Sequence, residues 1–441
     1  MPNSVWGSFG ATSPSREMFA TETFAVLRTY TNPRSDANVS IAVDGGITKG
    51  DGLGGIFYYD PSSVLPDDNI NVISPASAIG RWIRRDQSAP GINQYRKNAI
   101  INGGMEIAQR GTNFPAIVSG TYSLDRWIYQ KAGTMIHTVS QDTDVPTVAQ
   151  AGQLFLNSIR LNLTTPQAII GVNDYTLISQ LIEGYNWRAL AQRIFTLSFW
   201  VKATLPGIYC VAFQNSVSDR AYTDEFTINA SNIWEKKTIT LISPSPSTGT
   251  WNYTTGLGLI FRIVLACGTA NQGIKQNWNL PVAATANQIN GVQGAALDFR
   301  ITGVQLEAGN VASEFERRTI QEELQLCQRY YQKTFAQGIT PIQNIGVNTG
   351  EQTFPIILAG AVAGHSSRVA LNPTMRIAPN IIFYNPLALN AQARDIINNT
   401  DCSATVVQAV RDSGFRIDFT GNAGSAAGNL AAVHWTADAE I

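Results

Sequence analysis

Apolar and polar residues alternate over residues 297–302, and this short period constrains the fold more than any other feature of the sequence. Leu297, Phe299 and Ile301 face one way and the polar residues between them face the other, which is typical of a half-buried strand. Gly303 interrupts the alternation before it resumes. Similar runs recur at intervals of about ten to twenty residues, with turn residues between them. The sequence therefore predicts a β-sandwich in the centre of the chain.

A clear helical period follows this strand. Thr319 precedes Glu322 by three positions, which matches a capping box, so we expect a helix to begin near Ile320. Apolar residues at helical spacing define one face of this helix: Ile320, Leu324, Cys327 and Tyr331. Arg329 and Lys333 are expected in its last turn, where basic side chains favour the helix dipole. We interpret the segment as a linking helix that packs by one stripe.

The composition limits the function. Of 441 residues, 44% are hydrophobic and only 14% are charged, with a formal net charge of -1, so the chain is globular with a weakly charged surface. It contains no long basic run, which argues against nucleic acid as the main partner. Its apolar runs are too short to span a bilayer, and the first ten residues lack the basic start and apolar core of a signal peptide. We therefore expect neither membrane insertion nor export by a signal peptide.

The four cysteines are widely scattered and form no metal-binding pattern: Cys210, Cys267, Cys327 and Cys402. We expect free, mostly buried thiols, as in a protein that folds in a reducing cytoplasm. Asp142 and Asp144 form a DxD pair that could hold a cation, although a solvated turn is the favoured interpretation. Asp125 and Arg126 lack an adjacent nucleophile or base, so a structural role is favoured over a catalytic one.

The first ninety or so residues alternate short β-prone runs with turns. Residues 23–30 are interpreted as one strand. Gly50, Gly52 and Gly55 satisfy GxGxxG, but a strand rather than a helix is expected after them, so we favour a turn between strands over a phosphate-binding loop. The basic cluster Arg81–Arg85 is interpreted as a solvated strand end.

Several phrases together resemble a family of bacteriophage tail-fibre and tail-tip modules with a carbohydrate-binding-like jelly roll. These phrases are INGGMEIAQRGT (101–112), LDRW (124–127), FTLSFWVKA (195–203), WEKKTITL (234–241), VQLEAG (304–309) and LCQRYYQK (326–333). The resemblance runs through residues 97–333. The glycine-rich loop, YYDP and GRWIR near the start resemble the small β-module that opens many phage tail spikes and fibres.

The resemblance, read with the strand pattern, implies a mainly β architecture in four parts. Residues 1–95 form an amino-terminal β-module that attaches to other phage tail or baseplate proteins. Residues 96–318 form the jelly-roll β-sandwich, residues 319–333 the linking helix, and residues 334–441 a C-terminal β-sandwich tip domain. It further implies a homotrimer in the virion tail, assembled in the host cytoplasm, that binds host cell-surface glycan or protein. We expect no enzymatic activity, catalytic residue, metal or cofactor.

Aromatic side chains are the candidate glycan-binding residues, because flat rings pack against the apolar faces of sugars. Three tryptophans lie in strand patterns and are expected in the core: Trp127, Trp200 and Trp234. Five rings lie in segments that we expect to be loops, and they form the candidate glycan platform: Tyr185, Trp187, Trp251, Tyr253 and Trp278. Local loop packing or a subunit contact is the alternative role.

The tip domain offers a second set of candidates. If the amino-terminal module attaches to the virion, the far end of the chain is the natural receptor-contacting part, and four residues there are expected to be exposed: Tyr384, Asn385, His365 and Trp435. A structural role is the alternative for each of them.

Three classes of function remain open. The preferred one is a receptor-binding tail fibre protein, followed by a structural virion adaptor or decoration protein without receptor contact. The third is a surface-polysaccharide depolymerase. The motifs GxSxG, HExxH and the P-loop lysine are absent, but the two acids of a glycosidase can lie far apart in sequence.

Overall fold

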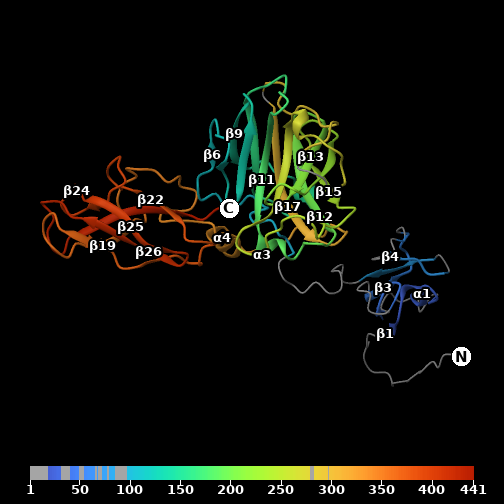
Figure 1. Cartoon of the computed structure of the whole chain (residues 1–441). Helices are drawn as coiled ribbons and strands as arrows, with labels where there is room; N and C mark the ends of the chain where they lie inside the picture. Colours follow the sequence, from blue (N-terminus) through green and yellow to red (C-terminus); the bar gives the residue numbers. More distant parts are fainter. Residues whose placement is uncertain are drawn as a thin grey trace, which may run out of the picture. The chain divides into compact units, whose positions relative to one another are not determined.

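The computed structural model describes residues 18–30, 40–48, 54–64, 67, 72–76, 79–84, 97–278, 283–295 and 297–441. The chain divides into two compact units, Met1–Tyr95 and Arg96–Ile441 (Figure 1). Strands dominate both units, which confirms the mainly β prediction. No helix in the described residues is long and apolar enough to cross a membrane.

The amino-terminal unit is a small five-stranded sheet in the order β1-β2-β3-β5-β4. Its elements are β1 (Met18–Thr21), α1 (Phe24–Leu27), β2 (Ser40–Val43), β3 (Gly55–Asp60), β4 (Val72–Ile73) and β5 (Arg81–Arg84). The core contains Phe24, Leu27, Ile41, Val43, Phe57, Tyr59, Ile73 and Trp82. β1 and β2 are parallel, and the other pairs are antiparallel.

Two predictions for this unit were wrong. Residues 23–30 contain the single-turn helix α1 instead of a strand. Phe24 and Leu27 are three positions apart, so one helical turn places both side chains in the core of the unit. Arg84 is 2% exposed: its guanidinium donates to the Gly54 carbonyl and lies 4.8 Å from the centre of the Phe57 ring, so it is not solvated. Gly50, Gly52 and Arg85 lie outside the described residues. Gly55 opens β3, as expected.

The jelly roll consists of two six-stranded sheets that enclose one core. The first sheet has the order β15-β12-β17-β10-β9-β6 and the second the order β14-β13-β16-β11-β8-β7. The strands are β6 (Asn113–Phe114), β7 (Thr121–Tyr122), β8 (Trp127–Ala132), β9 (Ile136–Asp142), β10 (Ser158–Thr165), β11 (Tyr175–Glu183), β12 (Phe195–Ala203), β13 (Gly207–Gln214), β14 (Ala221–Ile228), β15 (Glu235–Thr240), β16 (Leu257–Cys267) and β17 (Asp298–Ala308). Short helices α2 (Val148–Ala151), η1 (Thr269–Asn271) and α3 (Gly184–Trp187) connect them.

The apolar face of the predicted alternation lies in the core, but the prediction of half-buried strands was wrong, because polar residues of the opposite face are buried too, such as Ser198 of β12 and Thr302 of β17. Leu197, Phe199 and Val201 of β12 are fully buried between the sheets. The three tryptophans predicted in strand patterns are buried, although Trp234 lies just before β15: Trp127, Trp200 and Trp234. Trp127 belongs to the main core, whereas Trp200 and Trp234 pack with Phe155 in a separate cluster.

Gly303 bends β17 without ending it. Its φ is +60°, in the left-handed region, and the register between β12 and β17 shifts between Ser198 and Trp200. A Cβ atom at Gly303 would lie 2.8 Å from the Phe155 ring. The glycine therefore allows a β-bulge over which an aromatic ring packs.

The linking helix α4 (Ile320–Gln328) begins where the capping box predicts. The Glu322 amide donates to the Thr319 hydroxyl at 3.3 Å, and the Thr319 amide donates to the Glu322 carboxylate at 2.9 Å. The predicted stripe was wrong at both ends, because Ile320 is 58% exposed and Tyr331 belongs to a strand. Cys327 is the helix residue that is fully buried. The expected basic last turn is also wrong, because the helix ends at Gln328.

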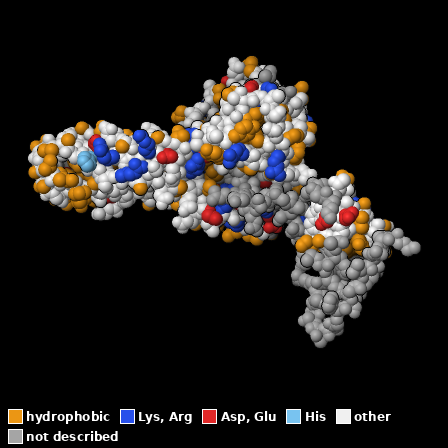
Figure 2. Space-filling model, turned by 60° about the horizontal axis from the view of Figure 1, so that its bottom comes forward, with side chains coloured by type: hydrophobic (Ala, Val, Ile, Leu, Met, Phe, Trp, Pro, Cys, Tyr) orange, Lys and Arg blue, Asp and Glu red, His pale blue; other side chains and the backbone are white. Residues whose placement is uncertain are grey.

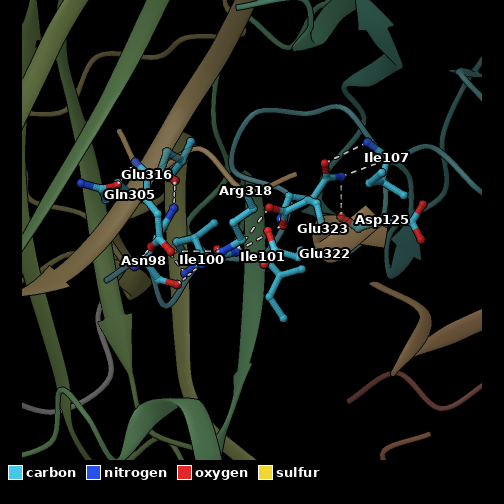
Figure 3. Close-up of polar contacts among 12 residues, drawn as sticks. Asn98, Ile100, Ile101, Ile107, Asp125, Gln305, Glu316, Arg318, Glu322 and Glu323 are labelled. Carbon is cyan, nitrogen blue, oxygen red and sulfur yellow. Dashed lines mark hydrogen bonds and ion pairs between the residues drawn. The ribbon is translucent and has the colours of Figure 1, made fainter. Parts of the chain in front are cut away.

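The start of the second unit is held against α4 and β17 by buried polar groups (Figure 3). The Asn98 side-chain amide donates to the Val304 carbonyl at 2.9 Å, and the Asn98 backbone amide donates to Glu316 at 2.6 Å. Arg318 donates to the carbonyl groups of Asn98 and Ile100 and pairs with Glu323. These contacts attach the irregular segment before β6 to β17 and the linking helix.

The C-terminal domain is built from two sheets around β27 and β26. Its strands are β18 (Tyr331–Lys333), β19 (Gln352–Pro355), β20 (Ala363–His365), β21 (Val369–Ala370), β22 (Asn380–Tyr384), β23 (Arg394–Asp395), β24 (Thr400–Asp401), β25 (Ser403–Arg411), β26 (Gly414–Thr420) and β27 (Leu430–Asp438). β18 pairs with β27, so the residues after α4 already belong to this domain. β27, which lies at the centre of its sheet, is the last strand of the chain.

Candidate functional site

Three of the five rings predicted as a glycan platform form one aromatic ladder at a loop edge of the jelly roll. The rings of Trp187 and Trp251 stack with their centres 5.1 Å apart and an interplanar angle of 25°. Trp251 meets Trp278 edge to face at 5.8 Å, and Trp278 contacts Tyr222 at 5.4 Å. The ladder therefore runs from α3 through the 248–256 loop to the loop after η1 and ends on β14.

The rings differ in their exposure. Trp187 was expected in a loop, but it lies in α3 and is fully buried, because it packs edge to face on Phe195 in the core. Its indole N–H has no hydrogen-bond partner in the described residues. Trp251 and Trp278 are half-buried, and their indole N–H groups donate to the carbonyl groups of Thr248 and Ser243. Trp187 is thus a buried support for more accessible rings.

The remaining two platform residues, Tyr185 and Tyr253, lie on α3 and on the 248–256 loop. Tyr185 of α3 is 45% exposed, and the Arg188 guanidinium lies 5.2 Å from the centre of its ring. Tyr253 is half-buried and packs against the edge of the jelly-roll core. We define the aromatic surface as the four accessible rings, Tyr185, Trp251, Tyr253 and Trp278, supported by Trp187.

The backbone of α3 is joined directly to the 248–256 loop. The amides of Gly184 and Tyr185 donate to the carbonyl groups of Gly256 and Thr254, at 2.8 and 3.0 Å. A Cβ atom at Gly184 would lie 2.6 Å from the Thr254 amide nitrogen, so only glycine permits this close approach. The two segments that carry Tyr185, Trp251 and Tyr253 therefore form one continuous backbone support.

The C-terminal candidates do not form an exposed group. Tyr384 is half-buried and meets Phe335 edge to face at 5.3 Å, and His365 is exposed on β20. Asn385 and Trp435 were expected to be exposed, but their exposed fractions are 0% and 6%. Asn385 is buried because its side-chain amide donates to Asn390 and Asp401, and Trp435 because it lies on the central strand β27 against Phe415.

The acidic pair Asp142 and Asp144 forms a turn, as expected, but it is only partly solvated: the Asp144 amide donates to the Asp142 carboxylate at 2.8 Å, and the side chains are 19% and 34% exposed. Asp144 accepts hydrogen bonds from Lys202 at 2.7 Å and from the Trp234 indole at 2.9 Å, and Asp142 lies 3.4 Å from Arg300. Both carboxylates therefore have cationic protein partners. No cluster of three or more potential metal ligands occurs among the described residues. Asp125 and Arg126 are buried in structural contacts, as expected: Asp125 accepts from Gln109, and Arg126 pairs with Glu440.

Sequence reasoning missed two residues that complete the site. Tyr222 extends the ladder, and Arg376 donates to the Thr255 carbonyl at 2.7 Å. Strand alternation could have placed Tyr222 on the core side of β14. No local signal identifies Arg376, because its partners lie in distant segments of the chain.

Residues 20–87 match the family described as phage tail protein small four-stranded beta-sheet domain. The amino-terminal unit is therefore similar to this phage tail domain. This match confirms the resemblance of the first ninety or so residues to a phage tail module and suggests a virion component. Relative to the four strands of the family description, the unit has five, of which β4 has only two residues. No curated protein sequence matches the chain.

Solved structures with similarity to the chain include a phage protein and two carbohydrate-related proteins. The enzymatically active domain of tailspike protein 4 from bacteriophage CBA120 is 16% identical, with 44% of this chain and 22% of that chain covered and a TM-score of 0.25. A putative sugar binding protein from Bacteroides thetaiotaomicron is 14% identical, covering 48% and 100%, with a TM-score of 0.28. A family 11 carbohydrate-binding module from Clostridium thermocellum is 10% identical, covering 44% and 95%, with a TM-score of 0.25. The chain spans about a fifth of the tailspike chain, and at these TM-scores we draw no functional conclusion from any of the three.

Proposed function

We propose that this chain is a non-enzymatic tail fibre protein that attaches the virion to carbohydrate on the host cell surface through the aromatic surface. One observation carries the proposal: accessible rings gather at one loop edge, on a buried tryptophan, in a chain with a phage tail domain. Flat rings with polar edges suit the apolar faces and hydroxyl groups of sugars.

The surroundings of the rings supply hydrogen-bonding groups. Thr254 and Asn252 lie beside Tyr253, and the Arg220 guanidinium reaches the Thr248 hydroxyl at 3.3 Å. A shallow surface of this kind gives weak binding at one site. Several copies on one virion would raise the overall strength by multivalent attachment, which suits a fibre with several identical chains.

The proposal includes a homotrimer, as the resemblance implies, with the amino-terminal unit attached to other tail or baseplate proteins. The C-terminal domain exposes large aliphatic side chains, among them Ile357, Leu358, Leu389 and Ile397, and Figure 2 shows hydrophobic side chains gathered at one end of it. Aliphatic side chains suit a protein contact better than a sugar contact. A mass of three chains in solution supports this arrangement, and a monomer contradicts it.

The test measures binding of the purified full chain to host cells. Trp251→Ala and Tyr185→Ala remove rings of the aromatic surface, and Ile169→Ala is the control because Ile169 is 85% exposed and lies outside that surface. We expect both ring variants to lose most of the binding. Tyr185→Ala should keep a melting temperature close to the wild type, whereas Trp251→Ala should remain folded with a lower melting temperature, because it loses packing on Trp187 and Trp278. Unchanged binding by both variants would mean that the aromatic surface is not the receptor site. A wild-type chain that does not bind cells would favour a structural adaptor.

A surface-polysaccharide depolymerase is the second candidate, because desolvation raises the pKa of two carboxyl groups, those of Glu106 and Asp224. A raised pKa is what a general acid in glycan hydrolysis requires. These residues belong to different segments, since Glu106 lies near Arg317 and Asp224 lies on β14 beside Gln276. Release of reducing sugar from host polysaccharide, lost in Asp224→Asn, would establish this alternative.

A further inference from the structure

The aromatic surface lies at the boundary between the jelly roll and the C-terminal domain. β11 ends at Glu183, and α3 begins at the next residue, so the position of Glu183 sets the position of Tyr185. Figure 1 shows α3 beside α4 at this boundary. Contacts that fix Glu183 therefore also fix the position of Tyr185 in the aromatic surface.

Glu183 is fixed by residues that follow the linking helix. Its side chain is 1% exposed, and it accepts two hydrogen bonds from Arg329, at 2.9 and 2.6 Å, and one from the Tyr330 hydroxyl at 2.7 Å. A bidentate pair of this kind restricts the orientation of both side chains. The hydrogen bond to Glu183 also raises the pKa of Arg329.

Arg376 fixes the 248–256 loop, which carries Trp251 and Tyr253 of the aromatic surface. Its guanidinium donates to the Thr255 carbonyl at 2.7 Å, to the Ala439 carbonyl at 2.8 Å and to the Glu440 carbonyl at 2.6 Å. One rigid planar group thereby joins the 248–256 loop to the end of the C-terminal sheet. The Arg376 amide also donates to the Arg329 carbonyl at 2.8 Å, so the two arginines are directly connected.

We infer that Arg329 and Arg376 are positioning residues for the aromatic surface, and that they couple its ring geometry to the C-terminal domain. Arg329 acts on α3 through Glu183, and Arg376 acts on the 248–256 loop through Thr255. The inference rests on the proposed function for its consequence on glycan binding, but the positioning itself is independent of any ligand. Any displacement of the C-terminal domain would be transmitted to Tyr185 and Tyr253.

Hydrogen–deuterium exchange of the full chain tests the positioning without a ligand. Arg376→Ala removes three hydrogen bonds, and Arg416→Ala is the matched control because it breaks an ion pair with Asp418 on the partly exposed surface of β26. We expect exchange in residues 184–187 and 252–256 to rise about tenfold in Arg376→Ala and to stay unchanged in Arg416→Ala. Unchanged exchange at both segments in a folded Arg376→Ala chain overturns the inference.

Two further variants keep the test decisive if Arg376→Ala does not fold. Glu183→Gln keeps the shape of the side chain but loses the charge that pairs with Arg329, and faster exchange at α3 is expected. Arg376→Lys retains the charge and can make only part of the hydrogen-bond set, so its exchange should fall between the wild type and Arg376→Ala. If both variants exchange like the wild type, the inference is wrong.

Cell binding separates this inference from the proposed function. We expect Arg376→Ala to weaken cell binding about tenfold, although no ring is changed. Faster exchange without any cell binding by the wild type would support the positioning and contradict the proposed function. Normal exchange in Arg376→Ala, with binding lost in Trp251→Ala, would support the function and contradict the positioning.

Discussion

The carboxylate of Glu183 and the guanidinium of Arg329 form a bidentate ion pair between the end of β11 and the end of α4, with distances of 2.9 and 2.6 Å. The Glu183 side chain is almost completely buried, whereas 31% of the Arg329 side chain is exposed. Without Arg329, Glu183 would be a buried unpaired charge, whereas without Glu183 the Arg329 guanidinium would still be partly solvated.

Glu183→Ala should destabilise the chain. The change leaves Arg329 without its anion and removes the acceptor of the Tyr330 hydroxyl, so we expect a loss of about 2 kcal/mol, less than for a fully buried pair because Arg329 keeps some solvent. Urea denaturation measures the change. Lys275→Ala is the control, because Lys275 is an exposed partner of Glu225 and its removal should cost much less stability than Glu183→Ala. Equal effects of the two variants would contradict the account of this boundary.

Gly303→Ala should also destabilise the chain. The new Cβ would sit in a left-handed backbone conformation, 2.8 Å from the Phe155 ring and 3.3 Å from Trp200. We expect a loss of about 1–3 kcal/mol. Gly294→Ala is the matched control because no atom lies within 4 Å of its added Cβ. Calorimetric melting of both variants is the measurement, and a neutral Gly303→Ala would show that the bulge does not require glycine.

Stability should fall in mild acid through His137. Burial lowers the pKa of His137 to about 4, below its ordinary value of 6.5. The unfolded chain therefore binds a proton at a higher pH than the folded chain, so the stabilisation is present above about pH 6.5 and is lost as the pH falls toward 4. The Tyr129 hydroxyl lies 2.8 Å from the His137 Nδ1 atom, and His137→Gln retains polar contact without titrating. We expect a flatter profile of unfolding free energy between pH 4 and 6.5 in this variant; an unchanged slope would exclude His137 as the cause.

The thiols should be unreactive in the folded chain. Cys210, Cys267, Cys327 and Cys402 are free and buried, as predicted from the sequence. Burial raises the pKa of Cys210 and Cys402 to about 11 and that of Cys267 to about 12, so almost no thiolate exists at neutral pH. A thiol reagent at pH 7.5 should label none of them until denaturant is added. Rapid labelling of any one in native conditions would contradict the burial described.

Local patterns were sufficient to predict most elements but not their long-range partners. The capping box at Thr319 and Glu322 located the start of α4, and the alternation in β12 identified the face that packs into the main core, because both depend on neighbouring residues. The burial of Trp435 and Arg84 could not be predicted, since each depends on strands that lie far away in sequence.

In the candidate site, too, neighbouring residues predicted the local structure but not the long-range contacts. Glycine, asparagine and threonine around Trp251 and Trp278 indicated loops, and both rings do lie between strands. The same reasoning failed at Trp187, because a single helical turn after Glu183 directs that ring into the core. The contacts of Arg376 join three segments, and no spacing in the sequence encodes them.

Binding of the labelled full chain to host cells, before and after periodate treatment of those cells, tests the central claim most directly. Periodate cleaves the vicinal diols of surface sugars and leaves most protein backbone intact. We predict that the wild type binds untreated cells, and that periodate and Trp251→Ala each abolish this binding while the variant remains folded. Full binding to periodate-treated cells would contradict attachment through carbohydrate.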